Sequence, residues 1–147
     1  KAKVVANVIS YNAVLEAACS KAMSQTYELF LQARQAGLYG SLCNKGPTLL
    51  DLHELSAGAG WMAVRWWLLE VLPLQLRSKP HSRGIVITGW GKSRPIWGKS
   101  DVQAFVLEKL KGHGIAANVQ KDNQGRLELH VTSSDLAAFR ARLQDGR

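Results

Sequence analysis

The sequence predicts an α/β domain that follows a pair of short helices. Three observations indicate this: apolar residues at helical spacing in the first 40 positions, short β-branched or alternating segments after residue 48, and helix-length apolar segments between them. The expected order after residue 48 is a β-α-β-α-β-β sandwich with a right-handed crossover. With 147 residues, 46% of them hydrophobic, the chain is long enough for one globular domain and a smaller unit.

The first unit, residues 8–40, is expected to be a helical hairpin. Its apolar residues fall on one face of each helix, at Tyr11, Val14, Leu15 and Ala18 and again at Tyr27, Phe30 and Leu31. Gly37 is the expected end of the second helix. Two short amphipathic helices cannot bury their apolar faces alone, so this unit is expected to pack on a neighbour.

The second unit, residues 48–132, is expected to contain strands and helices in alternation, followed by a helix in residues 133–147. The strands are "TLLDLH", "RGIVIT", "IAANVQ" and "RLELHV", and the helices are "WMAVRWWLLEVL" and "SDVQAFVLEKLKGHG". Ser100 and Gln103 resemble a capping box at the start of the latter helix. The last strand alternates strictly, which predicts one buried and one solvated face.

The charge distribution favours a polyanionic partner. The net charge is +8, and between Val71 and Ser100 there are six cationic residues and no acidic one. A basic surface of this kind is typical of nucleic-acid-binding domains. Lys121 and Arg126 flank a hairpin and would extend this surface, although their spacing does not require it, whereas Arg140 and Arg142 are expected to be solvated.

The sequence supports neither a membrane-spanning segment nor a structural metal site. No apolar run approaches the roughly 20 residues that span a bilayer, so we expect no membrane partner. The two cysteines and the scattered histidines His81, His113 and His130 lack ligand spacing, so no structural metal site is expected.

The candidate site combines the ends of the first two strands. "LDLH" closes the first and "TGWGKSR" follows the second, and a crossover connection brings both ends to the same edge of the sheet. Asp51 and His53, two residues apart, would point to the same side of a regular strand. The pair either faces a cleft and acts on a substrate, or is a hydrogen-bonded pair that fixes the adjacent loop.

The loop that starts at Thr88 has the composition of a phosphate cradle. Gly89 and Gly91 would let backbone amides approach a phosphate. Cationic groups and stacking faces for unpaired bases come from Lys92, Arg94, Lys99, Trp90 and Trp97. The glycine spacing fits neither a P-loop nor a dinucleotide fingerprint. A plain strand-to-loop turn is the alternative.

Two resemblances add to these observations. "VISYNAVLEA" and "YELFLQARQAGL" resemble the two helices of a pentatricopeptide repeat, in which an Asn at the place of Asn12 helps to select an RNA base. "LDLH" with "ITGWGKSR" and "WGKSDVQAFVLEKL" resembles the Smr (small MutS-related) domain over roughly residues 48–131. Repeat followed by Smr domain is the order found in plant and algal organelle proteins.

The Smr resemblance implies a fold like the C-terminal domain of bacterial translation initiation factor three. It also implies nucleic-acid binding, often with nicking or RNA endonuclease activity. Matching positions tied to cleavage are Asp51, His53, Thr88, Gly89 and Gly91. Glu54 departs from the Gly of many members, and its carboxylate would either repel a phosphate or help to hold a cation.

The leading hypothesis is therefore single-stranded RNA binding with phosphodiester cleavage, with DNA as the other possible substrate. Asp51 is expected to act as general base or as ligand to a divalent cation such as Mg²⁺, and His53 as proton donor to the leaving group. The alternatives are an RNA-binding module without catalysis and an assembly domain that uses exposed tryptophans. The protein is expected in the chloroplast, or else the mitochondrion, as a monomer or as part of a longer repeat protein whose targeting segment is not in this chain.

Overall fold

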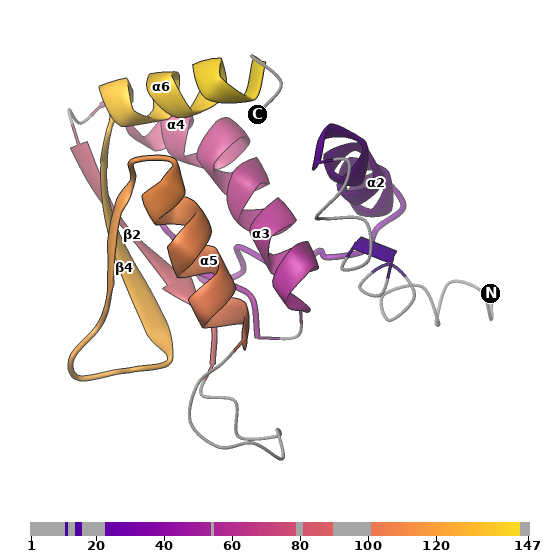
Figure 1. Ribbon diagram of the computed structural model, residues 1–147, viewed down its shortest axis with the longest axis horizontal. Coiled ribbons are helices and arrows are strands. Elements are labelled where there is room, and N and C mark those ends of the chain that lie inside the picture. The colour runs from indigo at the N-terminus through magenta and orange to yellow at the C-terminus, as the bar shows by residue number, and fades with distance from the viewer. Residues whose placement is uncertain are drawn as a thin grey trace.

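The computed structural model describes residues 11, 14–15, 23–53, 55–78, 81–89 and 101–144, and within them the chain has a mixed α/β architecture (Figure 1). The elements are α2 (Met23–Gln35), β1 (Leu49–Asp51), α3 (Ala57–Trp66), η1 (Trp67–Val71), α4 (Leu72–Gln75), β2 (His81–Ile87), α5 (Asp101–Gly112), β3 (Ala116–Val119), β4 (Arg126–Thr132) and α6 (Ser133–Gln144). The predicted order of strands and helices is confirmed.

The four strands form one sheet in the order β1-β2-β4-β3. β1 and β2 are parallel, whereas β4 is antiparallel to both β2 and β3. Helices α3, α5 and α6 lie on one side of β2 and β4 (Figure 1). The predicted alternation of the last strand is confirmed, because Leu127, Leu129 and Val131 are fully buried. The sheet therefore has one face covered by helices, and on the other face β4 presents its polar side chains.

Helix α2 ends as its sequence predicts. Gly37 has φ +93°, the left-handed conformation that glycine adopts without strain. Its N–H donates to the Arg34 carbonyl at 3.0 Å, and the N–H of Leu38 donates to the Ala33 carbonyl at 3.0 Å. These two bonds make a Schellman motif, which satisfies carbonyls at the helix end.

The first predicted helix is described only at Tyr11, Val14 and Leu15, which are helical. Leu15 is fully buried, as its predicted apolar face requires, but Val14 is 48% exposed, so its assignment to that face was wrong. Ala18 lies outside the described residues. The hairpin as a whole therefore remains a prediction.

Helix α2 packs on α3 through two reciprocal cation–π contacts. The Arg34 guanidinium of α2 lies 4.0 Å from the ring centroid of Trp66, and the Arg65 guanidinium of α3 lies 4.6 Å from that of Tyr27. Burial, with Glu70 nearby, raises the pKa of Tyr27 to about 12. The expectation that this unit packs on a neighbour is confirmed for α2.

Two of the three tryptophans between residues 61 and 67 belong to the core, and the third, Trp66, is partly buried against it. Trp61 and Trp67 are 2% and 0% exposed, and α3 packs between α5 and α2. Trp67 donates its indole N–H to the Pro47 carbonyl at 2.7 Å, which satisfies its polar group in the interior. An assembly surface made of these tryptophans is therefore not supported.

The predicted helix 61–72 is longer than expected and contains an irregular turn. It begins at Ala57, because the hydroxyl of Ser56 caps it by accepting from the Ala59 N–H at 3.2 Å. Its middle is the π-helical turn η1, and Pro73 is the second residue of the α4 turn that follows. Proline has no N–H, so the Leu69 carbonyl four residues earlier loses its usual donor. The Arg140 side chain of α6 donates to this carbonyl at 2.8 Å.

Replacing Arg140 with alanine should lower the free energy of unfolding by about 1 kcal/mol, because the Leu69 carbonyl loses its donor. In a Pro73→Ala background, the backbone N–H of the new alanine can donate to the Leu69 carbonyl. Replacing Arg140 in that background should therefore lower the free energy of unfolding by under about 0.5 kcal/mol. Urea unfolding of the four proteins measures this coupling. Equal costs of the Arg140 replacement in both backgrounds would contradict the assignment.

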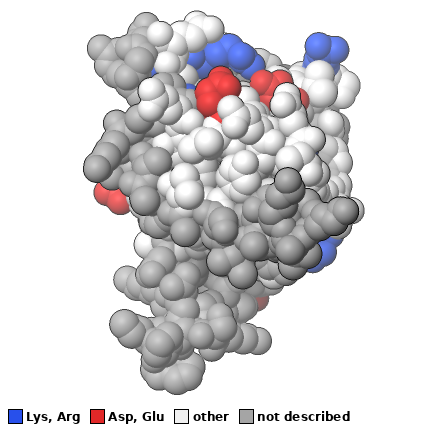
Figure 2. Space-filling view, turned by 90° about the vertical axis from the view of Figure 1, so that its right-hand side faces the viewer, with Lys and Arg blue, Asp and Glu red and all other residues white. Residues whose placement is uncertain are grey.

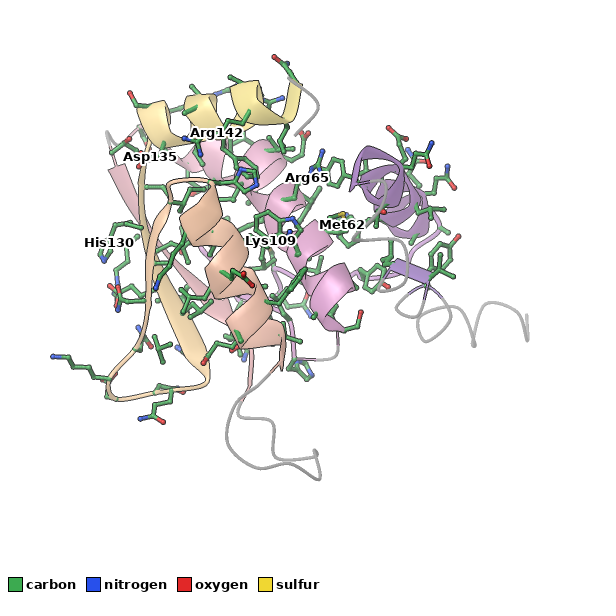
Figure 3. All side chains as sticks on the ribbon, viewed as in Figure 1. Met62, Arg65, Lys109, His130, Asp135 and Arg142 are labelled. Carbon is green, nitrogen blue, oxygen red and sulfur yellow. The ribbon has the colours of Figure 1, made fainter. Side chains whose placement is uncertain are left out.

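His113 lies in a cluster of aromatic rings beneath α6. Its ring stacks on Trp61 at 5.7 Å between centroids and meets Phe139 edge-on at 5.0 Å. Burial lowers the pKa of His113, and three cations lower it further. They are Arg142, Lys109 and Arg65, which come from α6, α5 and α3 (Figure 3). The cluster therefore favours the neutral imidazole.

This arrangement predicts a loss of stability in mild acid. The unfolded chain binds a proton at His113 near the ordinary pKa of about 6.5, whereas the folded chain binds it only at lower pH. Stability should therefore fall as pH drops below about 6.5 and level off below the folded pKa. A His113→Phe variant keeps a ring in the cluster and should lose this part of the pH dependence. Identical slopes of melting temperature against pH for parent and variant, between about pH 5 and 7, would refute it.

Candidate functional site

The Asp51–His53 pair lies at the end of β1, as the sequence predicts. His53 Nδ1 is 2.7 Å from Asp51 Oδ1, and the backbone N–H of His53 donates to the same oxygen at 3.1 Å. The strand ends at Asp51, so the two side chains meet through a turn and not through the alternation of a regular strand. The Asp51 side chain is 17% exposed and that of His53 58% exposed. A mostly buried carboxylate thus holds an imidazole that solvent can reach.

A pocket of about 210 Å³ opens beside this pair. It is lined by the segment 37–42 and by Asp51, His53 and Leu55. The segment is fixed to the strand, because the Asp51 N–H donates to the Leu42 carbonyl at 2.9 Å. Tyr39, with φ +56°, is buried in this wall, and its ring stacks on Phe30 of α2. The connection after α2 therefore shapes the site, which the motifs alone did not indicate.

Lys45 is a second contribution that the motifs did not indicate. Its ammonium nitrogen lies 3.9 Å from Asp51 Oδ2, and its side chain is 60% exposed. The carboxylate thus faces an imidazole on one oxygen and an exposed cation on the other. In a surface setting such a pair contributes little to stability, so its interest is chemical.

The end of the second strand lies next to the pair, as the crossover argument predicts. Asp51 is paired with Ile87 across the parallel strands, and the N–H of Leu52 donates to the Ile87 carbonyl at 2.8 Å. Thr88 and Gly89 follow directly. The start of the predicted cradle and the Asp51–His53 pair therefore share one edge of the sheet.

Thr88 and Gly89 are tied to the β3–β4 turn. The amides of both residues donate to the Gly125 carbonyl, at 2.8 and 3.0 Å, and the Thr88 hydroxyl donates to it at 3.2 Å. Gln103 of α5 donates from its Nε2 to Thr88 Oγ1 at 3.1 Å and to the Gln124 carbonyl at 2.7 Å. Its expected capping partner Ser100 lies outside the described residues, so the capping box stays a prediction. Because the Gly89 amide already has an acceptor, a phosphate contact from this amide would replace an existing hydrogen bond. In this structure Thr88 and Gly89 hold the end of β2 against the β3–β4 turn.

The remaining predicted site residues lie outside the described part of the chain. They are Asn12, Trp90, Gly91, Lys92, Arg94, Trp97 and Lys99, and the same is true of Glu54. Their roles therefore stay predictions.

The side chains around Asp51 decide which ligands the chain could offer to a divalent cation. Within the described ranges, no three His, Cys, Asp or Glu side chains are grouped as metal ligands. Mg²⁺ keeps several waters and uses one or two carboxylates with substrate phosphates, so Asp51 alone fits such a role. The described residues would offer the Asp51 carboxylate as the ligand.

The positive charge is not spread over the whole of the described surface. On the face shown in Figure 2, the Lys and Arg side chains that are described lie at the edges, with acidic side chains nearby, and uncharged residues cover the middle. No helix in the described part of the chain has the length and apolar character needed to cross a bilayer.

Comparison with known proteins finds similarity to a solved Smr domain. No family model and no curated protein matches this sequence. The solution structure of the B3BP Smr domain is similar at 19% sequence identity, with a TM-score of 0.41, and the match covers 74% of this chain and 97% of that domain. At this level of identity, functional residues are assigned from the motifs and geometry of the chain itself.

Proposed function

We propose that this chain is an Smr-type nucleic-acid-binding domain that cleaves single-stranded RNA. The observation that carries the proposal is the 2.7 Å contact between Asp51 and His53 at the mouth of a pocket, beside the end of β2. An imidazole held by a carboxylate is a recurring arrangement for proton transfer. The net charge of +8 and the cationic segment between Val71 and Ser100 support a polyanionic substrate.

The geometry suggests a division of labour in the cleavage step. With Nδ1 directed at Asp51, His53 would use its other ring nitrogen to donate a proton to the leaving 5′ oxygen as the P–O bond breaks. The proton of the attacking oxygen passes to Asp51 Oδ2, the carboxylate atom not engaged with His53. If the attacking oxygen is the ribose 2′-hydroxyl, the product is a cyclic phosphate. Lys45 would then offset negative charge near the phosphate.

The biological setting is part of the same proposal. The helical unit before the domain resembles a pentatricopeptide repeat, so we place the chain in an organellar RNA-processing protein, with the chloroplast preferred to the mitochondrion. In that setting Asn12 would contribute to base selection, and Trp90 and Trp97 would stack on unpaired bases.

The test is an incubation of the purified chain with end-labelled single-stranded RNA, with magnesium or with a chelator. A matched RNA with one 2′-deoxynucleotide at the cut site, and a DNA of the same sequence, accompany it. Cutting of RNA is the expected result. Loss of cutting at the deoxy position alone identifies the 2′-hydroxyl as the nucleophile, and loss in the chelator lane identifies a cation requirement. An RNA that is bound and never cut would reject cleavage.

A second function, RNA binding without catalysis, is favoured by a different observation. The amides of Thr88 and Gly89 are held by the Gly125 carbonyl, and Asp51 Oδ1 accepts the backbone N–H of His53. These bonds would suit a rigid frame for a binding loop. Under that function, replacing Asp51 or His53 would weaken RNA affinity, and any apparent loss of cutting would be no larger than this loss of affinity.

A further inference from the structure

The face of the sheet opposite the helices carries Asp51 at β1 and polar side chains on β4. Residues paired across neighbouring strands point to the same face, and Asp51, Ile87 and Arg126 make one such row. The next rows on this face are Leu49, Ile85, Glu128 and Asn118, and then Arg83, His130 and Ala116, so that β1 and β2 contribute apolar side chains besides Asp51 and Arg83, and the other polar ones gather on β4 and β3. Figure 3 shows His130 directed away from the helices. Asp51 therefore lies at one end of a row whose other end carries a cation.

This face is hollowed next to the β3–β4 turn. A polar groove of about 870 Å³ is lined by Arg83, Asn118, Gln120, Lys121, Asp122, Asn123, Arg126 and Glu128. Among the described lining residues, three cations exceed two carboxylates. The uncharged residues of this described set are amides, which can both donate and accept hydrogen bonds. The composition suits a strand of phosphates and riboses better than an apolar ligand.

The charges of the groove are arranged unequally. Glu128 is held by Arg83 Nε, lies 3.2 Å from His130 Nε2 and accepts from Gln120 Nε2 at 3.5 Å. The hydrogen bond from Arg83 lowers the pKa of this carboxyl. By contrast, Arg126 and Lys121 form no ion pair with any residue that the structure describes. As far as the described residues go, two cations at the rim are thus available to an external anion.

We infer that this groove binds the phosphate backbone of the RNA strand on one side of the cleaved bond. The inference rests on the proposed function, because it assigns the path of the same substrate. Strands are about 4.8 Å apart, so the Arg126 Cα lies roughly 10 Å from that of Asp51, within one row of the sheet. None of the described residues that line the groove is aromatic, so their contact with the strand would be independent of base sequence.

The test compares two double variants with the same loss of charge. Arg126→Gln/Lys121→Gln removes the two groove cations, and Lys111→Gln/Arg142→Gln removes two exposed cations outside the groove, on α5 and on α6. Binding of an uncleavable single-stranded RNA is measured by fluorescence anisotropy at several salt concentrations. The groove variant should bind more weakly, and its slope of log affinity against log salt should be shallower by about 1.4, which is two phosphate contacts at about 0.7 each.

The outcomes separate this inference from the proposed function. A parent chain that binds and cuts RNA, with both double variants equal in affinity and slope, would overturn the groove assignment and leave the function standing. A parent chain that does not bind RNA would overturn both. Melting temperatures of all three proteins show that any loss of binding is not a loss of folding.

Discussion

Replacing His53 with alanine should slow RNA cleavage by about 10²–10⁴-fold and leave RNA affinity within about threefold of the parent. The imidazole is 58% exposed and contacts the Asp51 carboxylate at the strand end, so its loss should disturb packing little. Single-turnover rates at saturating protein measure the chemical step, and anisotropy measures affinity. The two groups act as one unit, so their losses should not multiply. The cleavage rate of the double variant His53→Ala/Asp51→Ala should therefore lie within about threefold of the rate of the slower single variant.

Glu108→Gln is the matched control for the removal of a carboxylate, since Glu108 is exposed on α5 and is neither in the pocket nor in the groove. It should cleave at the parent rate. Independent, multiplying losses from the His53 and Asp51 replacements would contradict the coupled arrangement.

Replacing Gly84 with alanine should destabilise the fold far more than a methyl group added at an open position. A Cβ on Gly84 would lie 2.6 Å from Cη2 of Trp67, whose ring is fully buried and fixed by its bond to Pro47. Overpacking against a ring that cannot move costs about 1–3 kcal/mol, which lowers the melting temperature by roughly 4–12 °C. Thermal unfolding followed by circular dichroism measures the shift.

The same substitution at Gly112 is the control. A Cβ there meets nothing within 4 Å, and this residue ends α5. Gly112→Ala should leave the melting temperature unchanged or raise it slightly, because alanine is the better helix former by about 0.5–1 kcal/mol. A Gly84→Ala protein as stable as the Gly112→Ala protein would show that Trp67 can yield.

The strand ends could be predicted from the sequence because their signals are local. The alternation of residues 126–131 and the β-branched run before Thr88 indicated the strands, and the crossover rule placed Asp51 near the end of β2. Gly37 indicated the end of α2 for an equally local reason, since a left-handed residue favours glycine.

The rest depends on contacts distant in sequence. Nothing near Arg140 reveals that Pro73 leaves the Leu69 carbonyl without a donor 71 residues away. The wall of the pocket comes from segment 37–42, which joins two units that the sequence pattern separates. Arg83 and Arg126 line the same groove because β2 and β4 are adjacent in the sheet order β1-β2-β4-β3, which the sequence pattern does not reveal. The start of α3 could have been found, because Ser56 is a favoured capping residue before an apolar run.

The central claim is that Asp51 and His53 carry out chemistry on a bound RNA. The most direct test measures RNA binding and RNA cutting in the same samples, at matched saturation, for the parent chain and for the Asp51→Ala variant. An Asp51→Asn variant, which keeps the shape of the side chain, is assayed beside them. We expect that the parent cuts, that both variants bind RNA as the parent does, and that neither cuts at a comparable rate. Binding and cutting that fall together in both variants would contradict the claim and make the pair a part of the frame of the binding loop.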